Sequence, residues 1–183
     1  MFSALSSPAI RLKLAQRSVS WVDTSLGRAA RTFCYSPCRA ARAGGTYTID
    51  VQSLKVNRDR LMQDLHTTCQ WGTGKRWGVE ATATGMSRLA LSDADKQARD
   101  WFIDTTKSLG CHVTVDSMGN IFAIRPGQDE GHPTVAGSHL DTQPSGGRYD
   151  GILGIHAGVE MLKVLDEMDI QTAFPVGVVN WTK

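Results

Sequence analysis

Three stretches of the chain carry apolar side chains at the three- and four-residue spacing of an amphipathic helix. The first covers residues 50–70, and its N-terminal cap is expected to be Asp50 or Asn57. The second follows Ser92, which with Asp95 has the S-x-x-D form of a capping box. The third covers residues 151–168. Four positions of the second helix are expected to be buried: Ala98, Trp101, Phe102 and either Thr105 or Thr106.

Short apolar or alternating runs predict strands in the second half of the chain. Residues 111–115 and 120–125 alternate on either side of a four-residue connection, which is typical of a β-hairpin. Residues 134–139 and 174–180 are apolar runs separated by the third helix, so they predict a βαβ unit with parallel pairing. The glycine- and threonine-rich stretch 71–85 is expected to be irregular. The order indicates an α/β fold with a mixed sheet flanked by helices.

Composition and charge divide the chain into a leader and a body. Apolar residues make up 41% and charged residues 21%, as in globular proteins. Residues 1–45 carry seven basic side chains and one acidic one, a net of +6, whereas the whole chain carries only +2. This serine- and arginine-rich, acid-poor leader predicts a mitochondrial transit peptide, with a cytoplasmic protein as the alternative. The mildly acidic body argues against nucleic-acid binding.

Two further features exclude other classes of protein. The four cysteines lack the spacing of a zinc ribbon or a disulfide framework, which fits a reducing compartment. Apolar runs are all shorter than the roughly 18 residues that a membrane span requires, so no membrane partner is expected.

The candidate chemistry lies at the end of the predicted strand 134–139. His139 and Asp141 form an H-x-D pair there, and strand alternation places both side chains on one side. An imidazole that binds a metal ion through one ring nitrogen can donate from the other to a carboxylate. Asp150 follows two glycines and precedes the third helix, so its carboxylate can reach the same strand end and bridge two cations. The spacing by itself leaves a structural histidine open as the alternative.

Longer segments carry a specific family resemblance. GSHLDTQPSGGRYDGILGIHAGVEML, residues 137–162, resembles the first metal motif of the dinuclear-zinc aminoacylase and carboxypeptidase superfamily. It is most similar to the branch of N-carbamoyl-L-amino-acid hydrolases, β-ureidopropionases and allantoate amidohydrolases. The segments SRLALSDADKQARDWF (87–102), VDSMGNIFAIRPG (115–127) and VVNWT (178–182) resemble the same branch, so the resemblance covers about residues 50–182.

The resemblance implies a hydrolase of linear C–N bonds other than peptide bonds, acting on N-carbamoyl-L-amino acids or ureido acids through metal-activated water. His139 would bind one of two divalent ions (zinc, manganese or cobalt), Asp150 would bridge both, and Asp141 would orient His139 as a catalytic residue. The complete family member would be a homodimer with a small-molecule substrate. An aminoacylase or dipeptidase of the same superfamily is the alternative, which the glycine-rich QPSGG disfavours only modestly.

The chain departs from the family pattern after VVNWT. The resemblance implies a Glu-Glu pair at this point, the first a general base and the second a metal ligand, whereas the chain reads Asn180-Trp181-Thr182-Lys183. Residues 46–183 are therefore expected to be the N-terminal, truncated half of a zinc-peptidase-like catalytic domain. A catalytically inactive fragment is the corresponding functional alternative, because zinc sites need three or four protein ligands.

Three aromatic or imidazole side chains have a structural and a functional interpretation. His156 lies on the third helix and is expected to be a packed helix histidine rather than a third metal ligand. Trp71 and Trp77 flank a glycine-rich loop and are expected to fill the core rather than to stack on nucleic-acid bases, because no basic stripe accompanies them.

Overall fold

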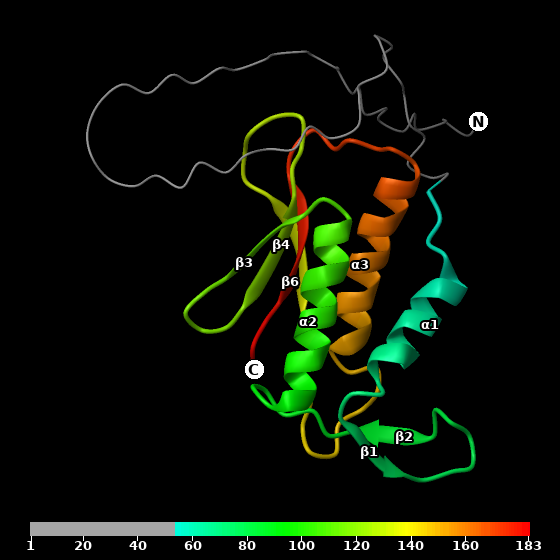
Figure 1. The fold of residues 1–183 in the computed structure, drawn as a ribbon. Coiled ribbons are helices and arrows are strands. Elements are labelled where there is room, and N and C mark those ends of the chain that lie inside the picture. The colour runs from blue at the N-terminus through cyan, green and yellow to red at the C-terminus, as the bar shows by residue number, and fades with distance from the viewer. Residues whose placement is uncertain (1–53) are drawn as a thin grey trace, which may run out of the picture. The chain divides into compact units, whose positions relative to one another are not determined.

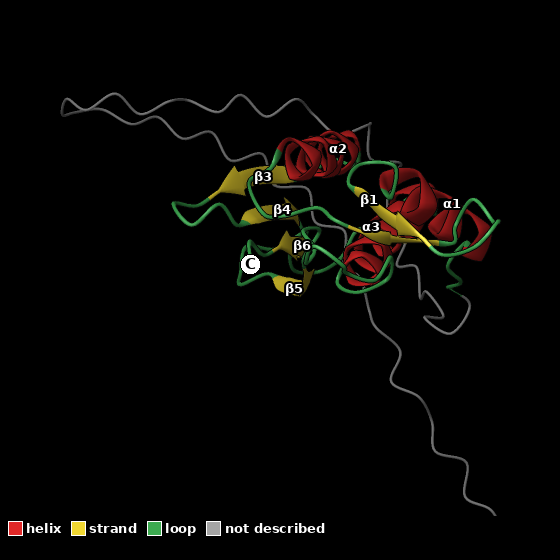
Figure 2. Cartoon of the chain, turned by 90° about the horizontal axis from the view of Figure 1, so that it is seen from below, coloured by secondary structure: helices red, strands yellow, loops and turns green. Residues whose placement is uncertain are grey.

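The computed structural model describes residues 54–183, which form one body whose helices lie on one face of a mixed sheet (Figures 1 and 2). The elements in chain order are α1 (Arg58–Thr68), β1 (Thr73–Arg76), β2 (Thr84–Met86), α2 (Asp93–Ser108), β3 (His112–Val115), β4 (Ile121–Arg125), β5 (Thr134–Ser138), α3 (Ile152–Glu167) and β6 (Val176–Asn180). The predicted leader lies outside the described residues. Within the described part, no helix is long and apolar enough to cross a membrane.

The four-stranded sheet has the order β3-β4-β6-β5. β3 and β4 form the predicted antiparallel hairpin, with Val113 opposite Ala123. β5 and β6 pair in parallel, with Ala136 opposite Val178, and α3 connects them. The predicted βαβ unit and the mixed sheet are therefore confirmed. Whereas the sequence predicts helices flanking the sheet, those of the described residues all lie on one face, and α1 is separated from the sheet by α3 (Figure 2).

Helix boundaries follow the polar caps. Asn57 is the residue that caps α1, and its side chain accepts a hydrogen bond from the Arg60 amide at 3.1 Å. Ser92 caps α2 by accepting from the Asp95 amide at 3.2 Å. The Asp95 carboxylate returns to the Leu91 amide at 2.9 Å, one residue before the position expected for a capping box. The first helix is thus shorter than predicted, and residues 50–53 lie outside the described part.

The main core lies between the sheet and the two inner helices. It joins residues of α2, α3, β4 and β6 with Cys111, just before β3, and Leu140, just after β5; the members are Ala98, Phe102, Cys111, Ile121, Ala123, Leu140, Ile155, Val159, Leu162 and Val178. Gly158 lets α3 approach β6, because a Cβ at this position would meet a Val178 methyl at 2.7 Å. The predicted burial of Ala98, Phe102 and Thr106 is confirmed, and Trp101 is half-buried against the same cluster.

The prediction of an irregular stretch at 71–85 is wrong for two short segments, β1 and β2, which pair as antiparallel strands. The stretch shows no apolar alternation because the two strands are held by main-chain pairing at glycines. A Cβ at Gly74 would lie only 3.0 Å from main-chain atoms of Gly85 and Met86. Glycine, which usually indicates a loop, here permits close contact between two backbones.

Candidate metal site

The H-x-D pair lies in the turn that directly follows β5. His139 is the first residue after the strand and Leu140 begins a bend, so their proximity comes from the turn rather than from strand alternation. The His139 Nδ1 lies 2.9 Å from the main-chain carbonyl oxygen of Asp141 and 3.6 Å from its carboxylate Oδ1. The carbonyl is thus the nearer acceptor for an Nδ1–H donor, an arrangement that in the neutral imidazole leaves the lone pair on Nε2.

The imidazole of His139 lies flat against the start of α3. A Cβ at Gly151 would lie 2.3 Å from Cε1 and 2.4 Å from Nε2 of this ring, so only glycine leaves room for it. Gly151 has φ +70° and ψ −47°, a conformation that other residues rarely adopt. Asp150, which is exposed, directly precedes Gly151, so it is next in the chain to the glycine that the His139 ring contacts.

The side chains of Asp141 and of its neighbour His139 are both largely buried. The side chains of His139 and Asp141 are 14% and 10% exposed. Burial raises the pKa of Asp141, and the nearby Asp95 acts in the same direction, whereas His139 and Lys183 oppose the shift. The Lys183 Nζ lies 3.4 Å from His139 Nε2, where an ammonium can donate to the nitrogen lone pair. The site therefore gathers groups of both charges around one imidazole.

The glycine-rich loop 142–150 is held by β2 and its extension. Met86 and Gly146 exchange two main-chain hydrogen bonds, each 2.9 Å long. Arg148 donates to the Thr84 hydroxyl at 2.5 Å. Thr84 and Met86 of β2 thus contact Arg148 and Gly146 of the loop. Arg88, two residues after Met86, contacts Thr142 in the same way. The sequence analysis did not predict that β2 holds this loop. The spacing of Thr84 and Met86, two residues apart as on one face of a strand, could have indicated a strand here.

The donor atoms around His139 fit part of a metal site. An imidazole nitrogen with a fixed tautomer and an adjacent carboxylate are ordinary ligands of zinc and manganese. Among the described residues, however, no group of three or more His, Cys, Asp or Glu side chains lies close enough to hold an ion. His139, Asp141 and Asp150 therefore form an incomplete set of ligands and supporting groups.

The interpretation of His156 as a packed histidine is confirmed. Its Nε2 lies 2.8 Å from the Thr68 hydroxyl, and its ring stacks on Trp101 with centroids 4.6 Å apart. The side chain is 1% exposed, and burial lowers its pKa to about 4. His156 is thus a neutral core residue that joins α1, α2 and α3.

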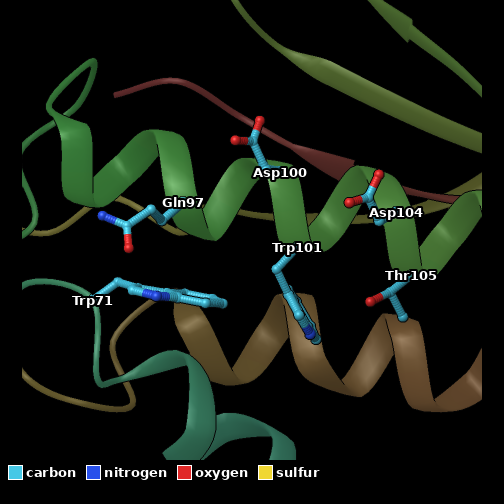
Figure 3. Close-up of a pocket in the computed structure, with 6 residues that line it drawn as sticks. All are labelled: Trp71, Gln97, Asp100, Trp101, Asp104 and Thr105. Atoms are coloured by element: carbon cyan, nitrogen blue, oxygen red, sulfur yellow. The ribbon is translucent and has the colours of Figure 1, made fainter.

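The tryptophans near the glycine-rich loop have different surroundings. Trp71 packs against the main core, as expected, whereas the prediction of a core role for Trp77 is wrong because it is 70% exposed. Trp71 and Trp101 also line a pocket of about 360 Å³ beside α2 (Figure 3). The other lining residues are Gln97, Asp100, Asp104 and Thr105. This pocket contains none of the three predicted site residues, so it does not extend the candidate metal site.

Comparison with known proteins places the chain among amidases. No protein-family model matches it. It is 39% identical to the N-carbamoyl-L-amino-acid amidohydrolase of Rhizobium meliloti over 132 residues, which are 72% of this chain and 30% of that protein. The crystal structure of a hydantoinase/carbamoylase family amidase from Burkholderia multivorans matches with a TM-score of 0.64 and 42% identity, again over 72% of this chain and 30% of the other. Over its described part, this chain belongs to the hydantoinase/carbamoylase family of amidases.

Other amidase relatives act on a different substrate by name. A ureidoglycolate hydrolase of Oryza sativa is 32% identical over 104 residues, which are 56% of this chain and 22% of that protein. The chain thus spans about 30% or less of the length of these amidase relatives. The family resemblance and the α/β fold predicted from the sequence are confirmed.

Proposed function

We propose that this chain supplies part of the active site of a metal-dependent amidohydrolase that cleaves linear C–N bonds outside peptides, in N-carbamoyl-L-amino acids or ureido acids. The observation that carries the proposal is the position of His139. Its ring lies between the Asp141 carbonyl, 2.9 Å from Nδ1, and Gly151, the residue that follows Asp150. The names of the relatives, an N-carbamoyl-L-amino-acid amidohydrolase and a ureidoglycolate hydrolase, support the substrate class.

In this proposal His139 binds one divalent ion through Nε2, and Asp150 bridges it to a second. Two such ions, zinc, manganese or cobalt, would lower the pKa of bound water and polarise the substrate carbonyl. Asp141 keeps the proton of His139 on Nδ1 through its carbonyl, while its carboxylate adds negative charge near the ring. The half-buried position of His139 limits the access of bulk water to its ring.

The remaining ligands belong, in this proposal, to polypeptide that the described residues do not include. Zinc sites use three or four protein ligands, and His139 and Asp150 are only two. The 183-residue chain by itself is therefore expected to show no turnover. Homodimer formation and a preference for carbamoyl over acyl substrates are proposed from the family resemblance alone, and an aminoacylase or dipeptidase stays the alternative.

A chimaera tests this function. Residues 54–183 would replace the matching 30% of the Rhizobium meliloti relative, and the product would be assayed on N-carbamoyl-L-amino acids with zinc, manganese or cobalt. We expect turnover, and we expect His139→Ala to lower it by at least about 10²-fold, because even residues that merely support metal ligands cost 10- to 100-fold. The matched control is His132→Ala, which alters an exposed loop histidine.

Two results would contradict the proposal. Equal turnover of the His139→Ala and His132→Ala chimaeras would show that His139 is not a ligand. Hydrolysis of N-acyl amino acids or dipeptides in preference to carbamoyl substrates would favour the alternative function.

A mitochondrial address is proposed from residues 1–45, which lie outside the described part. Their seven basic residues against one acid favour import into a negative-inside compartment. We expect these residues, fused to a fluorescent protein, to direct it to mitochondria. Substitution of Arg11, Arg17 and Arg28 by glutamate should leave the fusion in the cytosol. A diffuse signal from the unmodified fusion would contradict this address.

A further inference from the structure

Arg88 is the largest fully buried side chain of the described residues, and it lies directly behind the metal-site turn. Its Nε donates to the Leu140 carbonyl at 2.8 Å. Its main-chain amide donates to the Thr142 hydroxyl at 2.8 Å, and its carbonyl accepts from the Thr142 amide at 2.6 Å. Arg88 therefore holds the residues on both sides of Asp141.

The same guanidinium also ties the turn to the end of α1. Its Nη1 donates to the carbonyls of Thr68 and Trp71, at 2.8 and 3.0 Å. A positive charge is favourable at this place because the carbonyls at a helix C-terminus carry partial negative charge. Burial lowers the pKa of Arg88, and the carboxylates of Asp95 and Asp141 act against this shift electrostatically. The fork geometry of arginine allows one side chain to serve three carbonyls.

The turn itself leaves little other freedom. The Leu140 amide donates to the buried Asn180 side chain at 2.8 Å, and the Leu140 side chain is fully buried. Leu140 and Thr142 are thus fixed to the interior. His139, just before Leu140, and Asp141, between Leu140 and Thr142, lie against each other at the site. The position of the Asp141 carbonyl, which together with the Lys183 ammonium at Nε2 favours a proton on Nδ1 of His139, depends on these contacts.

We propose that Arg88 is a positioning residue of the candidate metal site, holding Leu140 and Thr142 so that the Asp141 carbonyl keeps the His139 proton on Nδ1 and presents Nε2 to a cation. The presentation of Nε2 to a cation rests on the proposed function, whereas the effect of Arg88 on the His139 tautomer does not. Arginine is required in this role because lysine, a single ammonium, cannot reach the three carbonyls with fork geometry.

The test uses the full chain, without metal, and Arg88→Met, Arg88→Lys and Arg125→Met variants. Arg125 is the matched control, because it is also a buried arginine that donates to a main-chain carbonyl, that of Ile170 at 2.7 Å. Long-range ¹H–¹⁵N NMR spectra report the His139 tautomer at a temperature where circular dichroism shows each variant to be folded. We expect Nδ1–H in the wild type and in Arg125→Met, and a substantial Nε2–H population in both Arg88 variants.

A second measurement is titration with Co²⁺ alone. We expect the Kd to rise by about 10- to 100-fold in Arg88→Met, as for other residues that orient metal ligands, and to change little in Arg125→Met. Unchanged tautomer and unchanged Kd in a folded Arg88 variant would overturn the proposal. If Arg88→Met does not fold, Arg88→Lys decides by the same criteria. If the wild-type chain takes up no cobalt, because the remaining ligands lie in other polypeptide, the tautomer alone decides the role of Arg88.

Discussion

Gly151→Ala is expected to lower the free energy of unfolding by about 2–6 kcal/mol and to displace His139 from the candidate metal site. Two costs combine at this residue. A non-glycine residue at φ +70° is strained by about 1–3 kcal/mol. The added methyl would also lie 2.3–2.5 Å from three atoms of the His139 ring, which overpacking experiments show to cost about 1–3 kcal/mol. Urea denaturation followed by circular dichroism measures the loss.

Gly110→Ala separates the two costs. Gly110 has a similar φ, +78°, but nothing lies within 4 Å of a Cβ built there. We therefore expect the control to lose only the part that belongs to the backbone, about 1–3 kcal/mol, and to leave the His139 NMR signals unchanged. Equal losses in the two variants, with His139 unmoved in both, would show that the ring does not pack on Gly151.

Glu160→Ala is expected to cost about 3 kcal/mol, because it removes the buried member of an ion pair, leaves Arg60 with only the exposed Glu167 as an acidic partner and takes away the acceptor of the Asn57 amide. The Glu160 carboxylate on α3 is 1% exposed and accepts from Arg60 Nε at 2.8 Å and Nη2 at 2.7 Å. It also accepts from the Asn57 amide, at 2.8 Å, at the start of α1. Although burial alone would raise the pKa of Glu160, these hydrogen bonds hold it below its ordinary value.

Glu167→Ala provides the matched control, because Glu167 pairs with the same Arg60 but has a 55% exposed side chain. Ion pairs in water contribute little, so this variant is expected to unfold at nearly the wild-type urea concentration. Equal loss of stability in the two variants would contradict the assignment of Glu160 as the residue that fastens α1 to α3. Glu160→Gln, which keeps a hydrogen-bond acceptor, should recover part of the loss.

These two predictions concern different levels of the molecule. Gly151 affects the site, where a backbone conformation makes room for one imidazole. Glu160 affects the packing of α1 on α3, which lies between α1 and the sheet (Figures 1 and 2). Both α1 and the site turn are also held by Arg88, so the stability of α1 and the geometry of His139 are connected through one buried side chain.

Periodicity and spacing along the sequence determined the second and third helices, the β3–β4 hairpin and the parallel β5–β6 pair. These elements place apolar residues at a regular period, and their caps and turns consist of local residues such as Ser92. The family was indicated by the resemblance of longer segments such as residues 137–162, whereas the spacing of His139, Asp141 and Asp150 by itself left a structural histidine open. The roles of His139, Asp141 and Asp150 as metal-site residues stay a prediction.

Only the tertiary structure decided what holds those residues in place. The pairing of β1 with β2 and the contacts of Arg88 with Leu140 and Thr142 join segments about 10 and more than 50 residues apart. At least one partner in each of these hydrogen bonds is a main-chain carbonyl or amide, which is the same at every residue and therefore leaves no pattern of paired side chains to recognise. The nearest partner of His139 Nδ1 is likewise the main-chain carbonyl of Asp141 rather than its carboxylate, and a carbonyl cannot be recognised from the residue type. Periodicity reveals which face of an element is buried, whereas the partners of a buried polar group depend on how distant segments come together.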